Sequence, residues 1–219
     1  MTKTCLLFDN DGTLVDSEYL CNLAIAQQFS QLQVTLDVDY LVEHYRGKKM
    51  ANILATLGAE HNVAIPDNFL PEYRQRVARL FEQELKPIAN VKKALDKLPQ
   101  KKAVVSNGPK FKIVQALALC KLQHYFGEHI YSAYDLEVYK PDPQIYLQVA
   151  SRLGAHPSEC VVIEDSITGV TAGSQAGIST LFYNKTKQQH SLPHVIDFDD
   201  MAHLPELIAD LSQSSITLK

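Results

Sequence analysis

Hydrophobic and polar positions fall into blocks along the chain, and the length of each block predicts its secondary structure. Short apolar runs are typical of buried parallel strands, and they occur at 4–8, 102–105, 160–163 and 179–182, with a weaker run at 128–132. Helical spacing between them predicts helices at 91–98, 111–119, from about 143 onward, and at 204–211. The polar stretch 184–200 is predicted to be a loop. Alternating strands and helices predict an α/β fold with a Rossmann-like, doubly wound and mainly parallel sheet.

The block 17–86 has a different pattern, with long stretches rich in Leu, Ala, Gln, Glu and Arg. Leu23, Ala26 and Phe29 are spaced as on one face of a helix, and prolines such as Pro66 interrupt the pattern. We expect four or five helices here, inserted after the first strand. The predicted domains are therefore an α/β core formed by 1–16 and 87–219, and an α-helical bundle cap formed by 17–86.

Composition and charge limit the possible partners. Hydrophobic residues make up 46% of the 219 residues and charged residues 21%, as in a soluble globular protein. The formal charge of −4 offers no basic field, so we expect neither a nucleic-acid nor a membrane partner. The four cysteines form no CxxC pair, and the first apolar run is too short for a signal-peptide core. A cytoplasmic monomer is the expectation.

Two carboxylates follow the first predicted strand in Asp9-Asn10-Asp11-Gly12-Thr13. One acid at such a strand end can attack a substrate while the other transfers protons. A purely structural Asp-Gly turn is an alternative. A calcium-binding EF-hand loop is a second alternative, but it would place Leu7 at the first acidic position and require a helix at 4–8.

Three further polar groups follow predicted strands or precede helices. Ser106-Asn107 ends the strand at 102–105, Lys140 precedes Pro141, and Glu164-Asp165 follows the strand at 160–163. Each has a structural alternative, namely a turn, a surface lysine and a helix cap. The acid pair is the most informative, because two adjacent carboxylates repel each other unless a cation lies beside them.

Together these groups resemble the four motifs of the haloacid dehalogenase superfamily, in the family's order. The first motif matches the stretch DNDGTLVDSE, the second Ser106-Asn107, the third Lys140 in KPDP and the fourth Glu164-Asp165-Ser166. The matches run from Phe8 to about Gly177. The resemblance implies a phosphate-transfer enzyme that acts on a small phosphate ester.

The resemblance also implies a role for each residue. Asp9 would be the nucleophile that forms an aspartyl phosphate, and Asp11 the general acid and base. Mg²⁺ would be the cofactor, held by the Asp9 carboxylate, the Asp11 backbone carbonyl and Asp165, with Glu164 binding directly or through water. The phosphoryl oxygens would be bound by Ser106, Asn107 and Lys140.

Substrate specificity is expected to lie in the cap. The cationic run Arg46-Gly47-Lys48-Lys49 is the candidate, because a cap loop of similar composition faces the active site in the subfamily that this chain resembles. A solvated helix start is the alternative reading.

Several functions compete with this one. A dehalogenase would lack Asp11, a signalling receiver domain would lack the helical block, and a non-catalytic phosphoprotein-binding domain would have lost Asp9 or Asp11. A β-phosphoglucomutase-like phosphomutase shares the cap placement and the Glu-Asp motif, and it stays open. The motif contexts, such as Ser106-Asn107-Gly108-Pro109, resemble bacterial 6-phosphogluconate phosphatases, which implies a sugar phosphate, with 6-phosphogluconate as one candidate substrate.

Overall fold

The computed structural model describes residues 2–45 and 47–213, which contain a single six-stranded sheet. The strand order is β3-β2-β1-β4-β5-β6 and all neighbouring strands are parallel. The strands are β1 (Cys5–Phe8), β2 (Lys101–Ser106), β3 (Ile130–Ser132), β4 (Cys160–Glu164), β5 (Ser179–Tyr183) and β6 (Val195–Phe198). The order reverses between β1 and β4, and ligands of doubly wound folds bind at this switch point, beyond the carboxyl ends of the strands.

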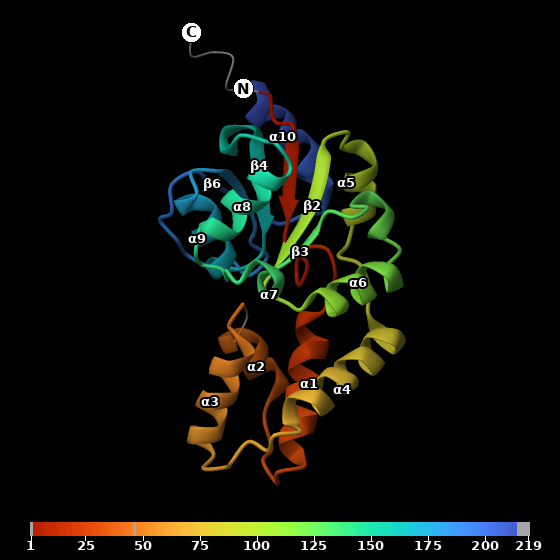
Figure 1. The fold of residues 1–219 in the computed structure, drawn as a ribbon, viewed down its shortest axis with the longest axis vertical. Coiled ribbons are helices and arrows are strands. Elements are labelled where there is room, and N and C mark those ends of the chain that lie inside the picture. The colour runs from red at the N-terminus through yellow and green to blue at the C-terminus, as the bar shows by residue number, and fades with distance from the viewer. Residues whose placement is uncertain (1, 46, 214–219) are drawn as a thin grey trace.

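Helices cover both faces of the sheet (Figure 1). Successive residues of a strand point to opposite faces, so Leu6 and Phe8 belong to one apolar cluster and Cys5 and Leu7 to the other. The first face packs against α5 (Val91–Lys97), α6 (Lys110–Leu119) and α10 (Leu204–Gln213). The second face packs against α7 (Ala133–Leu136), α8 (Gln144–Arg152) and α9 (Ile167–Gln175). The predicted doubly wound α/β class is confirmed.

Four helices lie between β1 and α5 in the chain, among the residues that the structure describes. They are α1 (Glu18–Ser30), α2 (Val38–Tyr45), α3 (Met50–Glu60) and α4 (Phe69–Glu84). These helices lie beyond one end of the sheet (Figure 1), and the rings of Phe29 and Phe69 pack edge to face with their centroids 5.2 Å apart. Because β1 leads into α1 through the loop that carries Asp9 and Asp11, the four helices stand next to the carboxyl ends of the strands.

The prediction of a loop for 184–200 was wrong in part, because this stretch contains β6. Thr180 and Phe182 of β5 pair with Val195 and Asp197 of β6. An edge strand is covered less than a central one, and Ile196 is 42% exposed. Its sequence therefore lacks the continuous apolar run that marks the central strands.

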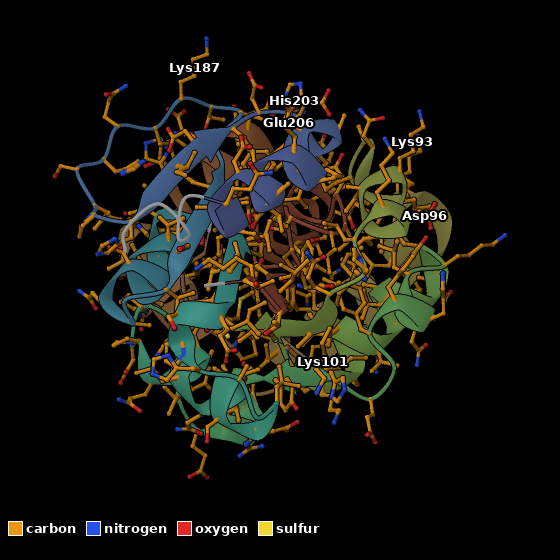
Figure 2. The ribbon with its side chains drawn as sticks, turned by 90° about the horizontal axis from the view of Figure 1, so that it is seen from above. Lys93, Asp96, Lys101, Lys187, His203 and Glu206 are labelled. Carbon is orange, nitrogen blue, oxygen red and sulfur yellow. The ribbon has the colours of Figure 1, made fainter. Side chains whose placement is uncertain are left out.

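Charged side chains surround the end of the molecule that is opposite the four helices. In the view from above, Lys187 and Glu206 point outward from the ribbon (Figure 2), and both are exposed.

Three of the cysteines, Cys5, Cys120 and Cys160, are buried. Among residues 2–45 and 47–213, no helix combines the length and apolar character that a membrane crossing requires.

Candidate active site

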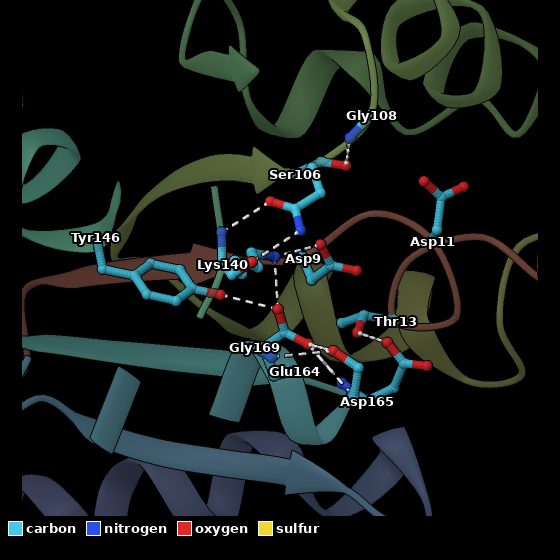
Figure 3. A network of polar contacts seen from close by, with 12 residues as sticks. Asp9, Asp11, Thr13, Ser106, Gly108, Lys140, Tyr146, Glu164, Asp165 and Gly169 are labelled. Carbon is cyan, nitrogen blue, oxygen red and sulfur yellow. Dashed lines mark hydrogen bonds and ion pairs between the residues drawn. The ribbon is translucent and has the colours of Figure 1, made fainter. Parts of the chain in front are cut away.

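The polar residues predicted from the sequence meet at the carboxyl edge of the sheet. Asp9 directly follows β1, Ser106 ends β2 and Glu164 ends β4, while Lys140 comes from the segment before α8. Parallel strands direct their carboxyl ends to the same edge, so residues that are far apart in the chain lie side by side (Figure 3). Asp9 and Glu164 flank the switch point between β1 and β4.

Lys140 is the centre of a buried polar network. Its ammonium nitrogen is 2.5 Å from both Asp9 Oδ1 and Glu164 Oε1 (Figure 3), and its side chain is 3% exposed. The backbone N–H of Lys140 donates to Asn107 Oδ1 at 3.0 Å, and Asn107 Nδ2 donates to the Lys140 carbonyl at 3.4 Å. Asn107, which directly follows β2, thus holds the backbone of Lys140 in place. Both ends of its side-chain amide form hydrogen bonds with that backbone.

Glu164 is fully buried and accepts several hydrogen bonds. The Tyr146 hydroxyl donates to Oε1 at 2.9 Å, and the Ser166 hydroxyl donates to Oε2 at 3.1 Å. The backbone N–H groups of Asp165 and Ser166 donate to the same Oε2. A side chain at Gly169 would place its Cβ 1.8 Å from Glu164 Oε1, so this carboxylate requires glycine there. The sequence did not predict Tyr146 and Gly169 as site residues. They reach Glu164 only because α8 and α9 pack against the sheet.

Asp9, Glu164 and Asp165 form a group suited to a cation. Each offers an oxygen, and these oxygens lie within 4.8 Å of one another. The Lys140 ammonium pairs with Asp9 and Glu164, and Asp165 adds a third carboxylate to the group. Burial, with Glu164 and Asp11 nearby, raises the pKa of Asp9 to about 8 against the opposing effect of Lys140. Clustered carboxylate oxygens are the hard ligands that a divalent cation such as Mg²⁺ prefers.

Asp165 is held against the turn after β1. Its Oδ1 accepts a hydrogen bond from the Thr13 hydroxyl at 3.1 Å. Gly12 has a φ of +81°, and a Cβ there would stand 2.1 Å from Asp165 Oδ2. The glycine of the Asp-Gly turn therefore serves two purposes, since it permits the left-handed backbone and leaves room for the carboxylate.

Asp11 lies apart from Glu164 and Asp165 (Figure 3). The Ser17 hydroxyl donates to Asp11 Oδ1 at 2.5 Å, and the Lys112 ammonium lies 3.0 Å from the same oxygen. Burial alone would raise the pKa of Asp11, but the Lys112 charge and the Ser17 hydrogen bond together lower it. Lys112, from the first turn of α6, was not predicted from the sequence.

A cavity of about 470 Å³ opens beside these groups. Its walls come from the strand ends, from α1 and α4, and from the connection between α2 and α3. The residues with hydroxyl, amide or charged side chains in the wall include Asp9, Asp11, Ser106, Asn107, Lys140, Asp165, Lys48, Lys49, Lys112, Tyr73, Tyr134 and Tyr139. This volume suits a small metabolite.

The predicted cationic run reaches the cavity. Gly47 and Lys48 line it, whereas Arg46 lies outside the described residues. A Cβ at Gly47, which has a φ of +72°, would lie 3.2 Å from Ser166 Cβ, so this connection approaches the fourth motif closely. The Lys49 ammonium stands 4.2 Å from the centre of the Tyr139 ring, and both residues line the cavity.

A doubly wound sheet with clustered acids, a buried lysine and a hydroxyl at its switch point is typical of an α/β enzyme. Comparison with known proteins identifies the family. A model of the family "haloacid dehalogenase-like hydrolase" matches residues 6–183. The chain belongs to this family, so the predicted family and the predicted hydrolase class are confirmed.

Several of the curated relatives are named as phosphatases. The 6-phosphogluconate phosphatase of Escherichia coli (strain K12) is 32% identical over 205 residues, which cover 92% of this chain and 93% of the relative. The phosphorylated carbohydrates phosphatase of Thermotoga maritima is 29% identical over 184 residues, with coverage of 81% and 83%. A haloacid dehalogenase-like protein of unknown function from Agrobacterium tumefaciens has a crystal structure that superposes with a TM-score of 0.80, at 28% identity, covering 96% of this chain and 99% of that one.

Proposed function

We propose that this protein is a Mg²⁺-dependent phosphatase of small phosphorylated metabolites, with sugar phosphates as the substrate class. The observation that carries the proposal is the buried arrangement of Asp9, Lys140, Glu164 and Asp165 at the switch point of the sheet. It combines a carboxylate nucleophile with fixed positive charge and a cation site, which phosphoryl transfer requires. The phosphatase activities named for the two curated relatives point the same way.

The mechanism proceeds in two displacements. A carboxylate oxygen of Asp9 attacks phosphorus while the bond from phosphorus to the ester oxygen breaks, which gives an aspartyl phosphate. Asp11 protonates the departing alkoxide and then removes a proton from the water that attacks the aspartyl phosphate. The second displacement releases inorganic phosphate and restores the Asp9 carboxylate.

Fixed charges around Asp9 make this attack feasible. Asp9, Asp165 and the Asp11 backbone carbonyl would hold Mg²⁺, with Glu164 binding directly or through water, and the bound cation would screen the negative charge of the phosphoryl group. Lys140 orients Asp9 and adds a positive charge beside the phosphoryl oxygens, to which the Ser106 hydroxyl donates a hydrogen bond. The Asn107 side chain keeps the Lys140 backbone in position.

Residues 17–86 are proposed to act as a cap on a core formed by 1–16 and 87–219. Closure of the helices over the strand ends would exclude water from the site and bring Lys48 and Lys49 to the substrate. A second anionic group on the substrate, such as the carboxylate of 6-phosphogluconate, would pair with these lysines and with Arg46. We further propose a cytoplasmic monomer.

Phosphate release from a substrate panel tests the proposal. The panel holds 6-phosphogluconate, other sugar phosphates, nucleotides and an aryl phosphate, each with Mg²⁺ and with a chelator. Release that requires Mg²⁺ and favours sugar phosphates is expected. Absence of release from every compound would refute the function, and interconversion of glucose phosphates without release would indicate a phosphomutase. Broad release would support the reaction and remove 6-phosphogluconate as the preferred substrate.

A further inference from the structure

Lys112 occupies a position that the helix dipole disfavours. It lies in the first turn of α6, where the helix dipole disfavours a positive charge. Its side chain is 19% exposed, whereas Lys110 on the same turn is exposed. The Lys112 ammonium is only partly solvated and forms an ion pair with Asp11. The same helix therefore carries one solvated lysine and one that is directed into the cavity.

The surroundings of the Lys112 ammonium leave it able to bind a ligand. Its nitrogen lies 3.0 Å from Asp11 Oδ1 and 5.7 Å from the centre of the Phe81 ring. Cys21 and Tyr73 lie close enough to interact with it, and both line the cavity. An ammonium has three N–H donors. Asp11 is the charged acceptor among these neighbours, the Tyr73 hydroxyl is a neutral acceptor, and the Cys21 thiol and the Phe81 ring are weak acceptors.

The two oxygens of Asp11 have different environments. Oδ1 accepts from Ser17 and faces Lys112. Oδ2 lies on the side of Ser106 and Gly108, since a Cβ at Gly108 would be 3.6 Å from Oδ2 and 3.4 Å from Ser106 Oγ. The ester oxygen that Asp11 protonates must lie within hydrogen-bond reach of this carboxylate. A substrate with its phosphoryl group at Asp9 and Ser106 thus extends its carbon chain past Lys112.

We propose that Lys112 is a specificity-determining residue that donates a hydrogen bond to an oxygen on the second carbon of the leaving group, the carbon next to the one that bears the phosphoester. The preferred substrates are then phosphate esters of vicinal diols, as in polyols and sugars, rather than simple alkyl phosphates. This inference rests on the proposed phosphatase function. It assigns recognition of the leaving-group oxygen to Lys112 in the core, and not to the cationic run 46–49 of the cap.

The test compares glycerol 1-phosphate with propyl phosphate, which share chain length and differ in their hydroxyls, with p-nitrophenyl phosphate as reference. We expect the unmodified enzyme to favour glycerol 1-phosphate in kcat/KM by about 10- to 100-fold, the value of a hydrogen bond to a charged donor. Lys112→Met should reduce this ratio to about threefold or less. Lys110→Met, the matched control on the same turn, should leave the ratio unchanged, and Lys112→Arg should keep a preference.

The possible results are distinguishable. If the unmodified enzyme does not prefer glycerol 1-phosphate over propyl phosphate, the inference is wrong. This result needs no variant, so the inference can be refuted even if the Lys112→Met protein does not fold. An equal loss on both alkyl esters in Lys112→Met also overturns it, because Lys112 would then act only by positioning Asp11. Failure of the unmodified enzyme to release phosphate even from p-nitrophenyl phosphate contradicts the proposed function itself.

Discussion

The two sides of the cavity are built in different ways. On the side of the sheet, Lys140 and Glu164 are buried, and each makes several short polar contacts. On the side of the helices, Lys48 and Lys49 are exposed, and each stands over a tyrosine ring. Chemistry requires charges that are fixed before the substrate arrives, whereas recognition tolerates side chains that adjust to it. The comparison predicts that substitutions on the side of the sheet reduce activity more than substitutions on the side of the helices.

Asp9→Asn should produce the largest effect, because it removes the proposed nucleophile and a carboxylate that pairs with Lys140. We expect turnover to fall at least about 1,000-fold while the fold is kept. Steady-state phosphate release measures the first point, and thermal unfolding followed by circular dichroism the second. Turnover close to that of the unmodified enzyme would contradict the assignment of Asp9.

Asp165→Ala should have the next largest effect. Loss of a hard carboxylate ligand should weaken Mg²⁺ binding and lower the rate together, by on the order of 100-fold. Titration of activity with Mg²⁺ separates the two, because weaker binding moves the midpoint and a lost contact in the transition state lowers the plateau. An unchanged midpoint would show that Asp165 is not a ligand.

Gly12→Ala tests whether the packing around Asp165 matters. The new Cβ would displace the Asp165 carboxylate, and we expect a loss of about 10- to 100-fold in metal affinity or activity. Gly154→Ala is the matched control, since Gly154 also has a positive φ but a Cβ there meets nothing within 4 Å. Both variants should lose about 1–2 kcal/mol of stability through backbone strain. Equal activity in the two variants would remove the steric argument.

Lys49→Met should have the smallest effect. It tests whether an exposed lysine on the side of the helices contributes to substrate recognition. An exposed cation contributes little, so we expect kcat/KM for 6-phosphogluconate to fall about fivefold and that for p-nitrophenyl phosphate to stay constant. Lys187→Met, another exposed lysine outside the cavity, is the control. A similar loss for both substrates would argue against recognition of a second anionic group by Lys49.

The sequence predicted the central strands and the residues that follow them, because a buried parallel strand requires a continuous apolar run. It did not predict β6, whose edge position allows a mixed sequence. It also gave no indication of Lys112, since a lysine in the first turn of a helix has the pattern of a surface residue. The roles of the individual site residues and the boundaries of the cap stay predictions.

Local pattern determined the α/β class, the inserted helices and the position of each acid at a strand end, because these depend on neighbours within a few residues. Tertiary structure decided which groups meet. Lys140 and Asp9 are 131 residues apart, and only the parallel packing of β1 beside β4 and the placement of α8 bring Lys140 between Asp9 and Glu164. The same holds for Lys112 and Asp11. Contacts between distant segments depend on how whole elements pack, and no local pattern encodes that arrangement.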